Sequence, residues 1–336
     1  FEKQKIPFNK HAVAITCEGS ELDQLAQKEE WLARFPMWDW VGGRTSLFSN
    51  VGLLPCALQN MDISALVQGA TEMDILTRNT EVLNNPAMML ALSWYSCTEG
   101  CGKKNMVVIP YKDSLALFPK YLQQLIMESL GKKLSLDGRK VFQGLTVYGN
   151  KGSTDQHAYV QQLRDGLDDS FVTFIEVQVS RNASHVKVEG ELTSGDFLEG
   201  FFLGTREALT EVNRPSITLT MKHLNAQSLG ALIALFERAV GFYASFVRIN
   251  AYHQPGVEAG KKAAKKFLTI QQQIVHFLSE RAGYYFSPEE VANALNLTSD
   301  VENVFKILEY LAANKRIFRN KLLPLTKSTY CIKKKQ

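Results

Sequence analysis

The stretch FVTFIEV, residues 171–177, decides the fold class of this chain. It is short, mostly apolar, rich in β-branched and aromatic residues, and bounded by polar ones. That composition is typical of a strand buried on both faces of a parallel sheet. Three other stretches share it: AVAIT at 12–16, MVVIP at 106–110 and SITLTM at 216–221. We therefore expect four buried strands.

Longer segments with helical periodicity separate these strands. They are residues 46–58, 86–95, 113–127, 156–167, 195–209 and 228–247. Strand–helix alternation at this spacing predicts an α/β fold with a mainly parallel sheet and helices on both faces. In such folds ligands bind at the carboxyl ends of the strands, so the functional residues should lie in the loops there.

Residues 267–336 are organised differently. Ser287 with Glu290, and Ser299 with Glu302, match the capping box, in which each side chain satisfies a free backbone donor at a helix start. A β-prone pair of segments follows, at 317–319 and 329–332. These elements predict a small winged-helix-like unit, and the alternative is a terminal helical cap on the body of the protein.

Composition places the chain among ordinary globular proteins. It has 336 residues, with 45% hydrophobic and 21% charged, enough for two or three domains. No run of about 18 apolar residues predicts a membrane span. The start, FEKQKIPFNKHAV, has neither a signal-peptide core nor an initiator Met, so we expect an internal stretch of a longer protein. Five scattered cysteines indicate reduced thiols in a reducing, cytoplasmic compartment.

Charge is divided unevenly along the chain. From Gly260 onward 14 Lys and Arg face 6 Asp and Glu, a net +8, whereas the remainder carries −4. A basic tail can signal contact with nucleic acid, although it is more often a solvated surface.

Two segments in the first half place chemically active residues beside glycines. In Trp40–Ser46, Gly42 and Gly43 permit close backbone approach, and Arg44 at a helix start offers a fixed cation to an anion. In Met127–Lys132, Glu128 follows an amphipathic stretch. By composition alone Arg44 and Glu128 would be surface charges, and Glu128 becomes a base only where a cleft perturbs its pKa.

Two further segments follow. Residues 149–157, GNKGSTDQH, form a polar loop after a strand-like segment, with His157 near the start of the next helix. A lone histidine is more often structural than catalytic. Residues 251–262 place a Pro-Gly turn before a helix whose first turn holds Glu258 and Lys261.

Taken together and in this order, the four segments resemble the glucose-6-phosphate isomerase family. The matching motifs are W-D-W-V-G-G-R-x-S at 38–46, M-E-S-x-G-K at 127–132, Q-H-A at 156–158 and Q-x-G-V-E-x-G-K at 254–261. Residues 149–166 look most like the plastid and cyanobacterial branch. The resemblance extends from the first strand to about Lys266 and implies sugar-isomerase-type parallel-sheet domains.

The resemblance implies the reversible isomerisation of glucose 6-phosphate and fructose 6-phosphate in glycolysis and gluconeogenesis. Glu128 would be the base that moves a proton between C2 and C1 through a cis-enediol. Arg44 would stabilise the enediolate, and Lys261 and His157 would assist opening of the sugar ring.

The same resemblance assigns Gly43 and Gln254 to the lining of the substrate pocket. It implies no metal and no organic cofactor, and a homodimer in which the histidine reaches the site of the other subunit. We expect no membrane or nucleic-acid partner.

The chain also departs from the family pattern. Thr45 stands where Tyr is usual, His253 where many members have Asp, and the 149–157 loop differs from the common G-E-P-G-T-N-G-Q-H. No Ser/Thr-rich phosphate-binding loop precedes the first strand. We therefore divide the chain into the C-terminal part of a first sugar-isomerase domain (1–60), a second such domain (61–266) and the winged-helix-like extension (267–336). Alone it should be inactive.

Three alternative functions fit parts of this sequence. A sugar-phosphate-sensing regulator would explain the basic tail, but it needs no combination of Glu128, His157 and Lys261. An enzyme that also accepts mannose 6-phosphate remains open because of Thr45 and the altered loop. A metal-dependent isomerase is disfavoured because no histidines form a ligand pair at helical spacing.

Overall fold

The computed structural model describes residues 1–180 and 186–333, without the side chains of Glu2, Val257, Glu258, Ala259 and Lys261. The chain forms two compact units, Phe1–His253 and Gln254–Gln336. Helix α10 (Pro255–Glu280) is continuous. The boundary at 266/267 expected from the sequence therefore falls inside a helix, whereas the compact units separate at 253/254.

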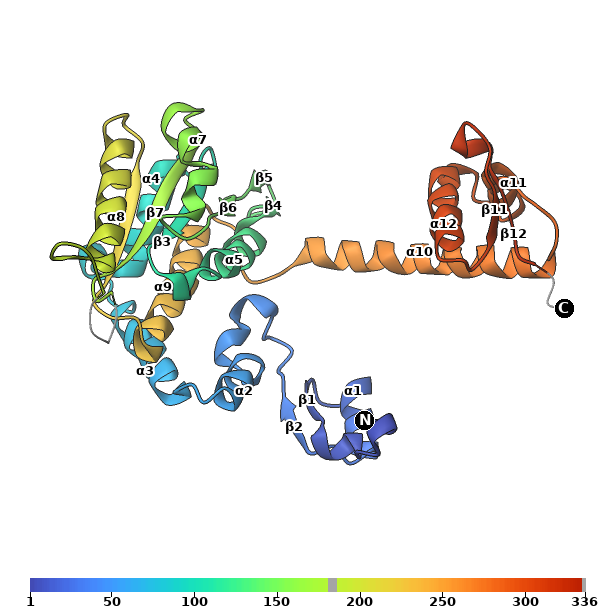
Figure 1. Ribbon diagram of the computed structural model, residues 1–336, viewed down its shortest axis with the longest axis horizontal. Coiled ribbons are helices and arrows are strands. Elements are labelled where there is room, and N and C mark those ends of the chain that lie inside the picture. The colour runs from blue at the N-terminus through green and yellow to red at the C-terminus, as the bar shows by residue number, and fades with distance from the viewer. Residues whose placement is uncertain (181–185, 334–336) are drawn as a thin grey trace. The chain divides into compact units, whose positions relative to one another are not determined.

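A four-stranded parallel sheet is the centre of the first unit (Figure 1). Its order is β10 (Ser216–Met221), β7 (Ser170–Val177), β3 (Asn105–Pro110) and β6 (Val147–Tyr148). In register, Val108 of β3 lies opposite Thr173 of β7. The strands expected at 106–110, 171–177 and 216–221 are confirmed, and the predicted α/β fold is confirmed with them.

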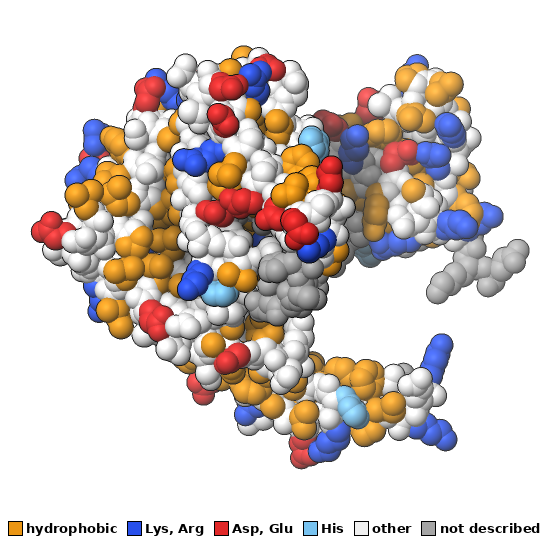
Figure 2. Space-filling view, turned by 60° about the vertical axis from the view of Figure 1, so that its left-hand side comes forward, with side chains coloured by type: hydrophobic (Ala, Val, Ile, Leu, Met, Phe, Trp, Pro, Cys, Tyr) orange, Lys and Arg blue, Asp and Glu red, His pale blue; other side chains and the backbone are white. Residues whose placement is uncertain are grey.

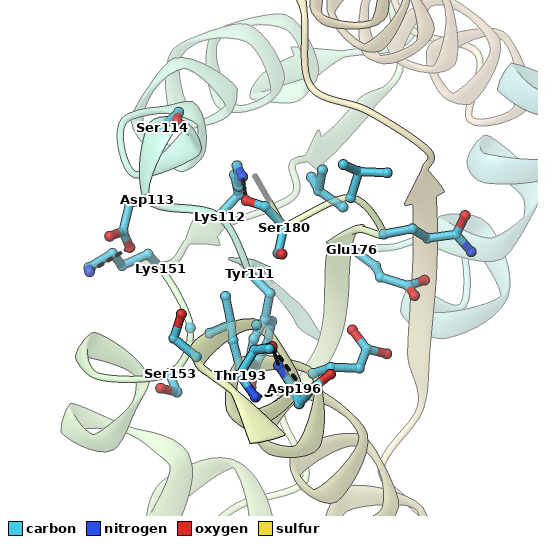
Figure 3. Close-up of a pocket in the computed structure, with 18 of the residues that line it drawn as sticks. Tyr111, Lys112, Asp113, Ser114, Lys151, Ser153, Glu176, Ser180, Thr193 and Asp196 are labelled. Atoms are coloured by element: carbon cyan, nitrogen blue, oxygen red, sulfur yellow. Dashed lines mark hydrogen bonds and ion pairs between the residues drawn. The ribbon is translucent and has the colours of Figure 1, made fainter. Parts of the chain in front are cut away.

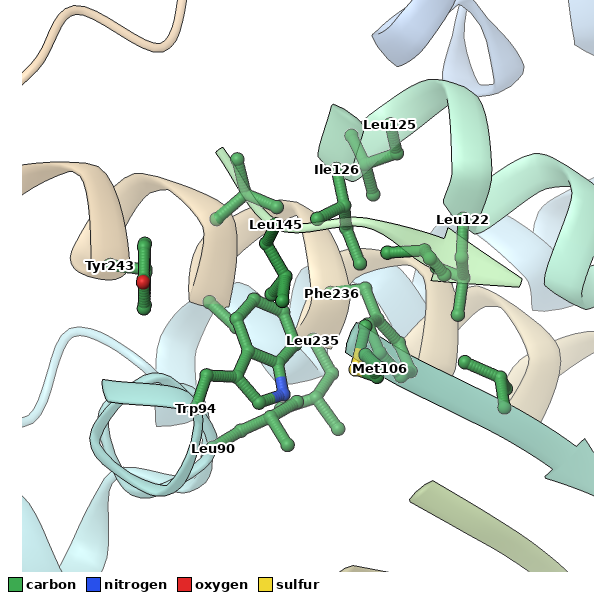
Figure 4. Close-up of a cluster of buried hydrophobic side chains, with 14 of the residues drawn as sticks. Leu90, Trp94, Met106, Leu122, Leu125, Ile126, Leu145, Leu235, Phe236 and Tyr243 are labelled. Atoms are coloured by element: carbon green, nitrogen blue, oxygen red, sulfur yellow. The ribbon is translucent and has the colours of Figure 1, made fainter. Parts of the chain in front are cut away.

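Helices cover both faces of this sheet because successive strand side chains point to opposite sides. Met106 and Val108 of β3 pack into one core with α4 (Pro86–Thr98) and α9 (Ala226–Phe246) (Figure 4). Val107 and Ile109 pack into the other, with α7 (Val160–Asp165) and α8 (Ser194–Thr210). Trp94, Phe236 and Tyr243 form the aromatic centre of the first core. Helices thus cover both faces of the sheet, as expected for strands with apolar side chains on both sides.

Helix α9 crosses α3 (Ile63–Leu76) at very short range, and α3 was not foreseen from the sequence. A Cβ on Gly69 would lie 1.8 Å from the Gln227 carbonyl oxygen, and one on Gly230 would lie 1.9 Å from that of Leu66.

By length and composition α9 could span a membrane, contrary to the sequence expectation. However, 56% of its apolar window is buried, and core helices pass the same test.

Gly230→Ala should therefore destabilise the protein by about 1–3 kcal/mol, because the backbone of α3 cannot yield without separating the two helices. The matched control is Gly204→Ala, which lies mid-helix in α8 with open space around it. There alanine should stabilise by about 0.5–1 kcal/mol through its higher helix propensity. Urea denaturation measures both changes, and equal effects at the two sites would contradict the close crossing.

Residues 1–60 contain a separate sheet. Strand β1 (Val13–Thr16), foreseen at 12–16, pairs in parallel with β2 (Ala33–Pro36) across α1 (Glu21–Lys28). Next come the turn η3 (Gly43–Phe48) and α2 (Asn50–Leu58). The predicted helix at 46–58 is thus a 3₁₀ segment followed by a true helix.

Two other predicted helices are also broken. The segment expected at 113–127 consists of η5 (Asp113–Leu115), α5 (Phe118–Leu122), the π-helical turn η6 (Gln123–Met127) and α6 (Glu128–Leu130). The one expected at 156–167 is η7 (Asp155–Ala158) with the short α7. Remaining elements of this unit are η1 (Glu2–Gln4), η2 (Phe8–His11), η4 (Val82–Asn84), β4 (Lys132–Leu134), β5 (Lys140–Gln143), β8 (Lys187–Glu189) and β9 (Leu192–Thr193).

The second unit has three helices and a hairpin. They are α10, α11 (Pro288–Ala294), α12 (Val301–Ala313) and the antiparallel pair β11 (Phe318–Asn320) and β12 (Thr329–Cys331), with the turns η8 (Thr298–Asp300) and η9 (Leu325–Lys327). Its core joins side chains of all three helices to Tyr330. The capping box of Ser287 is present. That of Ser299 is not, because η8 occupies this position and Asp300 becomes the N-cap residue.

Candidate functional site

Arg44 is buried, with 7% of its surface exposed. Gly42, in extended conformation, is the N-cap of η3, and Arg44 is the second residue of that turn. Its guanidinium donates to Ser129 Oγ at 2.8 Å, to the Ala251 carbonyl and to the Tyr252 carbonyl at 2.8 Å. These three hydrogen bonds fix the plane of the guanidinium between segments far apart in sequence.

Glu128 lies beside this guanidinium. Its Oε2 is 3.7 Å from Arg44 Nε, and its side chain is 32% exposed, so it reaches both the cation and solvent. Glu128 begins α6 directly after the π-helical turn η6. Such turns insert an extra residue into a helix and are frequent at functional sites. At 3.7 Å the two atoms form an ion pair but lie beyond the usual range of a direct hydrogen bond.

Lys132 supplies a second buried cation. It is 4% exposed, and its Nζ donates to the backbone carbonyl of Glu128 at 2.6 Å. Burial, with the nearby charge of Arg44, lowers the pKa of Lys132 to about 8, and Glu128 partly offsets this. Burial likewise lowers the pKa of Arg44, again offset by Glu128. The carboxylate of Glu128 therefore lies in a cationic environment.

A half-buried carboxyl, that of Glu237, lies near the backbone of Arg44. Tyr121 of α5 places its hydroxyl 3.3 Å from Glu237 Oε1 and 3.5 Å from the Arg44 carbonyl oxygen. Burial raises the pKa of Glu237 to about 7, against a smaller lowering by Tyr121. Burial and Glu237 together raise the pKa of the Tyr121 phenol. We call Arg44, Tyr121, Glu128, Ser129, Lys132 and Glu237 the Arg44 cluster.

Glu237 should make stability fall as pH rises. Its pKa is higher folded, at about 7, than its ordinary value of 4.5, so the folded state holds the proton more tightly between these values. Relative to Glu237→Gln, which does not titrate, the wild type should lose about 3 kcal/mol of unfolding free energy between pH 4.5 and 8. Denaturant unfolding across this range measures the difference, and a flat difference would show that Glu237 titrates normally.

The structure brings together three of the six residues expected from the sequence. Gly43 directly precedes Arg44 in η3, and Arg44 and Glu128 form the ion pair of the Arg44 cluster. His157 lies elsewhere: it is exposed on η7 and, within 1–180 and 186–333, takes part in no hydrogen bond or ion pair. Gln254 is the N-cap residue of α10 in the second unit. The side chain of Lys261 lies outside the described part of the chain.

Sequence reasoning missed Tyr121, Ser129, Lys132 and Glu237 as members of the site. Ser129 and Lys132 stand inside the M-E-S-x-G-K motif, so the motif itself was the available signal. The sequence signal for Glu237 was weaker, because it is only a lone carboxylate in the apolar stretch LGALIALFERAVGF. Such a residue is almost never fully buried unless it has a partner, and the partner, Tyr121, is over a hundred residues away in sequence.

A separate cavity of about 970 Å³ opens at the carboxyl ends of β3 and β7 (Figure 3). Its lysines are engaged: Lys112 donates to the Ser180 carbonyl, and Lys151 pairs with Asp113 at 2.7 Å. On its acidic side, burial and Glu176 raise the pKa of Glu199. The cavity shares no lining residue with the Arg44 cluster, although Ser153 and Thr154 connect it to the loop that carries His157.

No group of three or more His, Cys, Asp and Glu side chains that could hold a metal ion occurs in the described residues. The fold and the site thus define an α/β protein in which a buried arginine pairs with a partly exposed glutamate. Apolar side chains also gather on the surface of this unit (Figure 2). Among them are Phe197, Phe201 and Leu203 of α8.

Comparison with known proteins identifies the family. The family model of phosphoglucose isomerase matches residues 2–203 and 203–279. The chain is 57% identical over 94% of its length to the glucose-6-phosphate isomerase of Geotalea daltonii, and 58% identical over 93% to that of Trichormus variabilis. It covers 59% of each of these relatives. The chain belongs to the phosphoglucose isomerase family.

Solved structures agree with this assignment. A glucose-6-phosphate isomerase from Chlamydia trachomatis superposes with a TM-score of 0.73 at 26% identity, covering 81% of this chain and 55% of that one. A hypothetical protein from Thermus thermophilus superposes with a TM-score of 0.71 at 28% identity, covering 78% and 63%.

Proposed function

We propose that this chain is part of a cytoplasmic enzyme that interconverts glucose 6-phosphate and fructose 6-phosphate. The observation that carries the proposal is the carboxylate of Glu128, 3.7 Å from the buried Arg44 guanidinium and beside the buried Lys132. Relatives that bear the name glucose-6-phosphate isomerase at 57–58% identity support the reaction.

In the proposed reaction Glu128 acts as the general base. It takes the proton from C2 of the open-chain aldose, and the electron pair of the C2–H bond forms the C1=C2 bond of an enediolate whose charge is on O1. The proton of the C2 hydroxyl then passes to O1, C2 becomes the carbonyl carbon, and Glu128 returns its proton to C1 to form the ketose. The guanidinium of Arg44 lies beside the Glu128 carboxylate, and the ammonium of Lys132 donates to the Glu128 backbone carbonyl. A solvent-reaching position and a cationic environment are both required for this role, and Glu128 has both.

Arg44 would stabilise the negative charge that develops on the enediolate oxygen. Preorganised donors are effective because they need no rearrangement when charge develops. Of the five N–H groups of Arg44, three are used in its recorded hydrogen bonds to Ser129, Ala251 and Tyr252. The Nε–H remains on the side of Glu128, where the substrate oxygen would bind.

The remaining roles come from the family pattern. We propose that Lys261 and His157 assist ring opening, that Gly43 and Gln254 line the pocket, and that no cofactor takes part. His157 is exposed and makes no side-chain bond within the described residues, which suits a residue that acts in the site of a second subunit. The apolar side chains exposed on α8 suit an interface in a homodimer.

The two separate parallel sheets support the proposed division into a first sugar-isomerase domain, ending near residue 60, and a second. The chain spans 59% of the length of its relatives. We therefore propose that turnover requires a full-length protein, of the relatives' length and containing this chain, and that residues 1–336 alone are inactive.

The test is a coupled assay in which glucose-6-phosphate dehydrogenase reports glucose 6-phosphate formed from fructose 6-phosphate. The full-length protein should turn over, and residues 1–336 alone should not. Turnover by the shorter chain would contradict the need for full length. Binding of sugar phosphate by the full-length protein without turnover would replace the proposal by a sugar-phosphate sensor.

A further inference from the structure

Glu237 and Tyr121 are not used by the proposed reaction, yet they adjoin the backbone of Arg44. The Tyr121 hydroxyl lies 3.3 Å from Glu237 Oε1 and 3.5 Å from the Arg44 carbonyl oxygen. A tyrosine hydroxyl carries a single proton, so it can donate to only one of these two acceptors at a time. Which acceptor receives the proton depends on whether Glu237 can itself donate.

We propose that Tyr121 and Glu237 are positioning residues for Arg44, and that the protonation of Glu237 directs the single Tyr121 proton. When Glu237 is neutral, its carboxyl donates to the Tyr121 oxygen and the Tyr121 hydroxyl donates to the Arg44 carbonyl. When Glu237 is ionised, Tyr121 donates to the carboxylate instead. The Arg44 carbonyl then faces an oxygen lone pair and loses its donor.

The Tyr121–Glu237 pair adjoins the backbone of Arg44, so its hydrogen bonding can affect the position of the Arg44 guanidinium. Arg44 lies within the short 3₁₀ turn η3, and its side chain is anchored at the far end by Ser129, Ala251 and Tyr252. The near end is the Arg44–Thr45 peptide, which Tyr121 contacts. Restraint at both ends fixes the guanidinium relative to Glu128, and a shift of about 1 Å in such a group can cost on the order of 10²-fold in rate.

Lys132 is the other group of the Arg44 cluster with a pKa near that of Glu237, at about 8, and its ammonium donates to the Glu128 carbonyl. The Glu237→Gln variant retains Lys132 and so separates the two titrations. The elements packed against α9 are α3, α4, η6 and α6. Their ionisable residues include Glu72, which accepts from Gln227, and Asp74, which pairs with Arg78 and Arg238. Tyr95, Cys97 and Glu128 lie on α4 and α6, and Arg44 on η3. Burial is the principal influence on Glu237 and Tyr121 the only other one recorded, which agrees with its pKa near neutrality.

The test reads the Arg44 carbonyl directly, by NMR on residues 1–336. Arg-Thr occurs once in the sequence, at Arg44–Thr45. Labelling arginine carbonyl carbons with ¹³C and threonine nitrogens with ¹⁵N therefore isolates one amide signal. A hydrogen bond to a carbonyl changes the chemical shift of the following amide nitrogen. The signal should therefore move between pH 5.5 and 8.5, with a midpoint within about one pH unit of 7.

Three variants test which residues cause the change in the amide signal. In Glu237→Gln the amide donates at every pH, so the signal should stay near its acid position, and in Tyr121→Phe it should not titrate. Tyr243→Phe is the matched control: it removes a buried hydroxyl that hydrogen-bonds Thr98, from α9 but away from η3, and should titrate as the wild type does. A signal that still titrates in Glu237→Gln, or that never moves in the wild type, overturns the proposal.

The consequence for catalysis rests on the proposed function and is measured separately in the full-length protein. From pH 6 to 8.5 the kcat ratio of wild type to Glu237→Gln should fall about two- to tenfold, the range of one hydrogen bond. KM should change less than kcat. A titrating NMR signal without isomerase activity would contradict the proposed function alone. Normal isomerase activity with a pH-independent ratio and a static signal would contradict the positioning role alone.

Discussion

Glu128→Gln should lower kcat for fructose 6-phosphate isomerisation in the full-length protein by roughly 10²–10⁴-fold, the usual contribution of a positioned general base. Glutamine keeps the shape of the side chain but cannot accept the proton from C1 of fructose 6-phosphate. KM should change little, since Arg44 and Lys132 remain in place. The same coupled assay measures the loss, and circular dichroism checks that the fold is intact.

The control is Glu99→Gln. Glu99 is an exposed carboxylate that pairs with Lys103, and its neutralisation should leave kcat unchanged. Should Glu128→Gln and Glu99→Gln both retain full activity, the reaction would stand but the base would have to be another residue. A loss in both would point to a general effect of charge and not to a base.

Arg44→Met should cost both stability and rate. In residues 1–336 it should lower the unfolding free energy by about 3 kcal/mol, because the buried Ala251 carbonyl and its neighbours lose their charged donor. In the full-length protein it should lower kcat by about 10²–10³-fold through loss of charge stabilisation. Arg44→Lys should rescue little, since an ammonium cannot reproduce the fixed fork that reaches three acceptors.

Arg78→Met provides the comparison for stability. Arg78 is exposed and pairs with Asp74 one helical turn away, so its loss should change the unfolding free energy by less than about 1 kcal/mol. Urea denaturation of the two variants side by side separates a buried guanidinium from a surface one. A change for Arg44→Met no greater than that for Arg78→Met would mean that the buried hydrogen bonds add nothing to stability.

The sequence alone could locate the central strands. Strands β3 and β7 are buried on both faces over most of their length, so their segments are mainly apolar, and β10 is half-buried except at Thr220. It could also identify Arg44 and Glu128, because their motifs are short, ordered and specific. A local sequence pattern gave a wrong prediction where a neighbouring turn occupies the predicted position. At Ser299 the capping box did not form because η8 takes this position, and Asp300 instead contacts Asn303 and Lys266.

Helix α3 was missed because Gly69 interrupts its pattern, and glycine by itself argues against a helix. The physical reason for this glycine is the close backbone of α9, which only the folded structure shows.

The sequence by itself thus determined the strands β3, β7 and β10 and most of the helices beside them, and it singled out Arg44 and Glu128, since these follow from periodicity and local motif. Tertiary structure alone decided the electrostatics of the site. The raised pKa of Glu237 and the lowered pKa of Lys132 arise from burial. Burial depends on which distant segments pack around a charge, and no local pattern of residues encodes that.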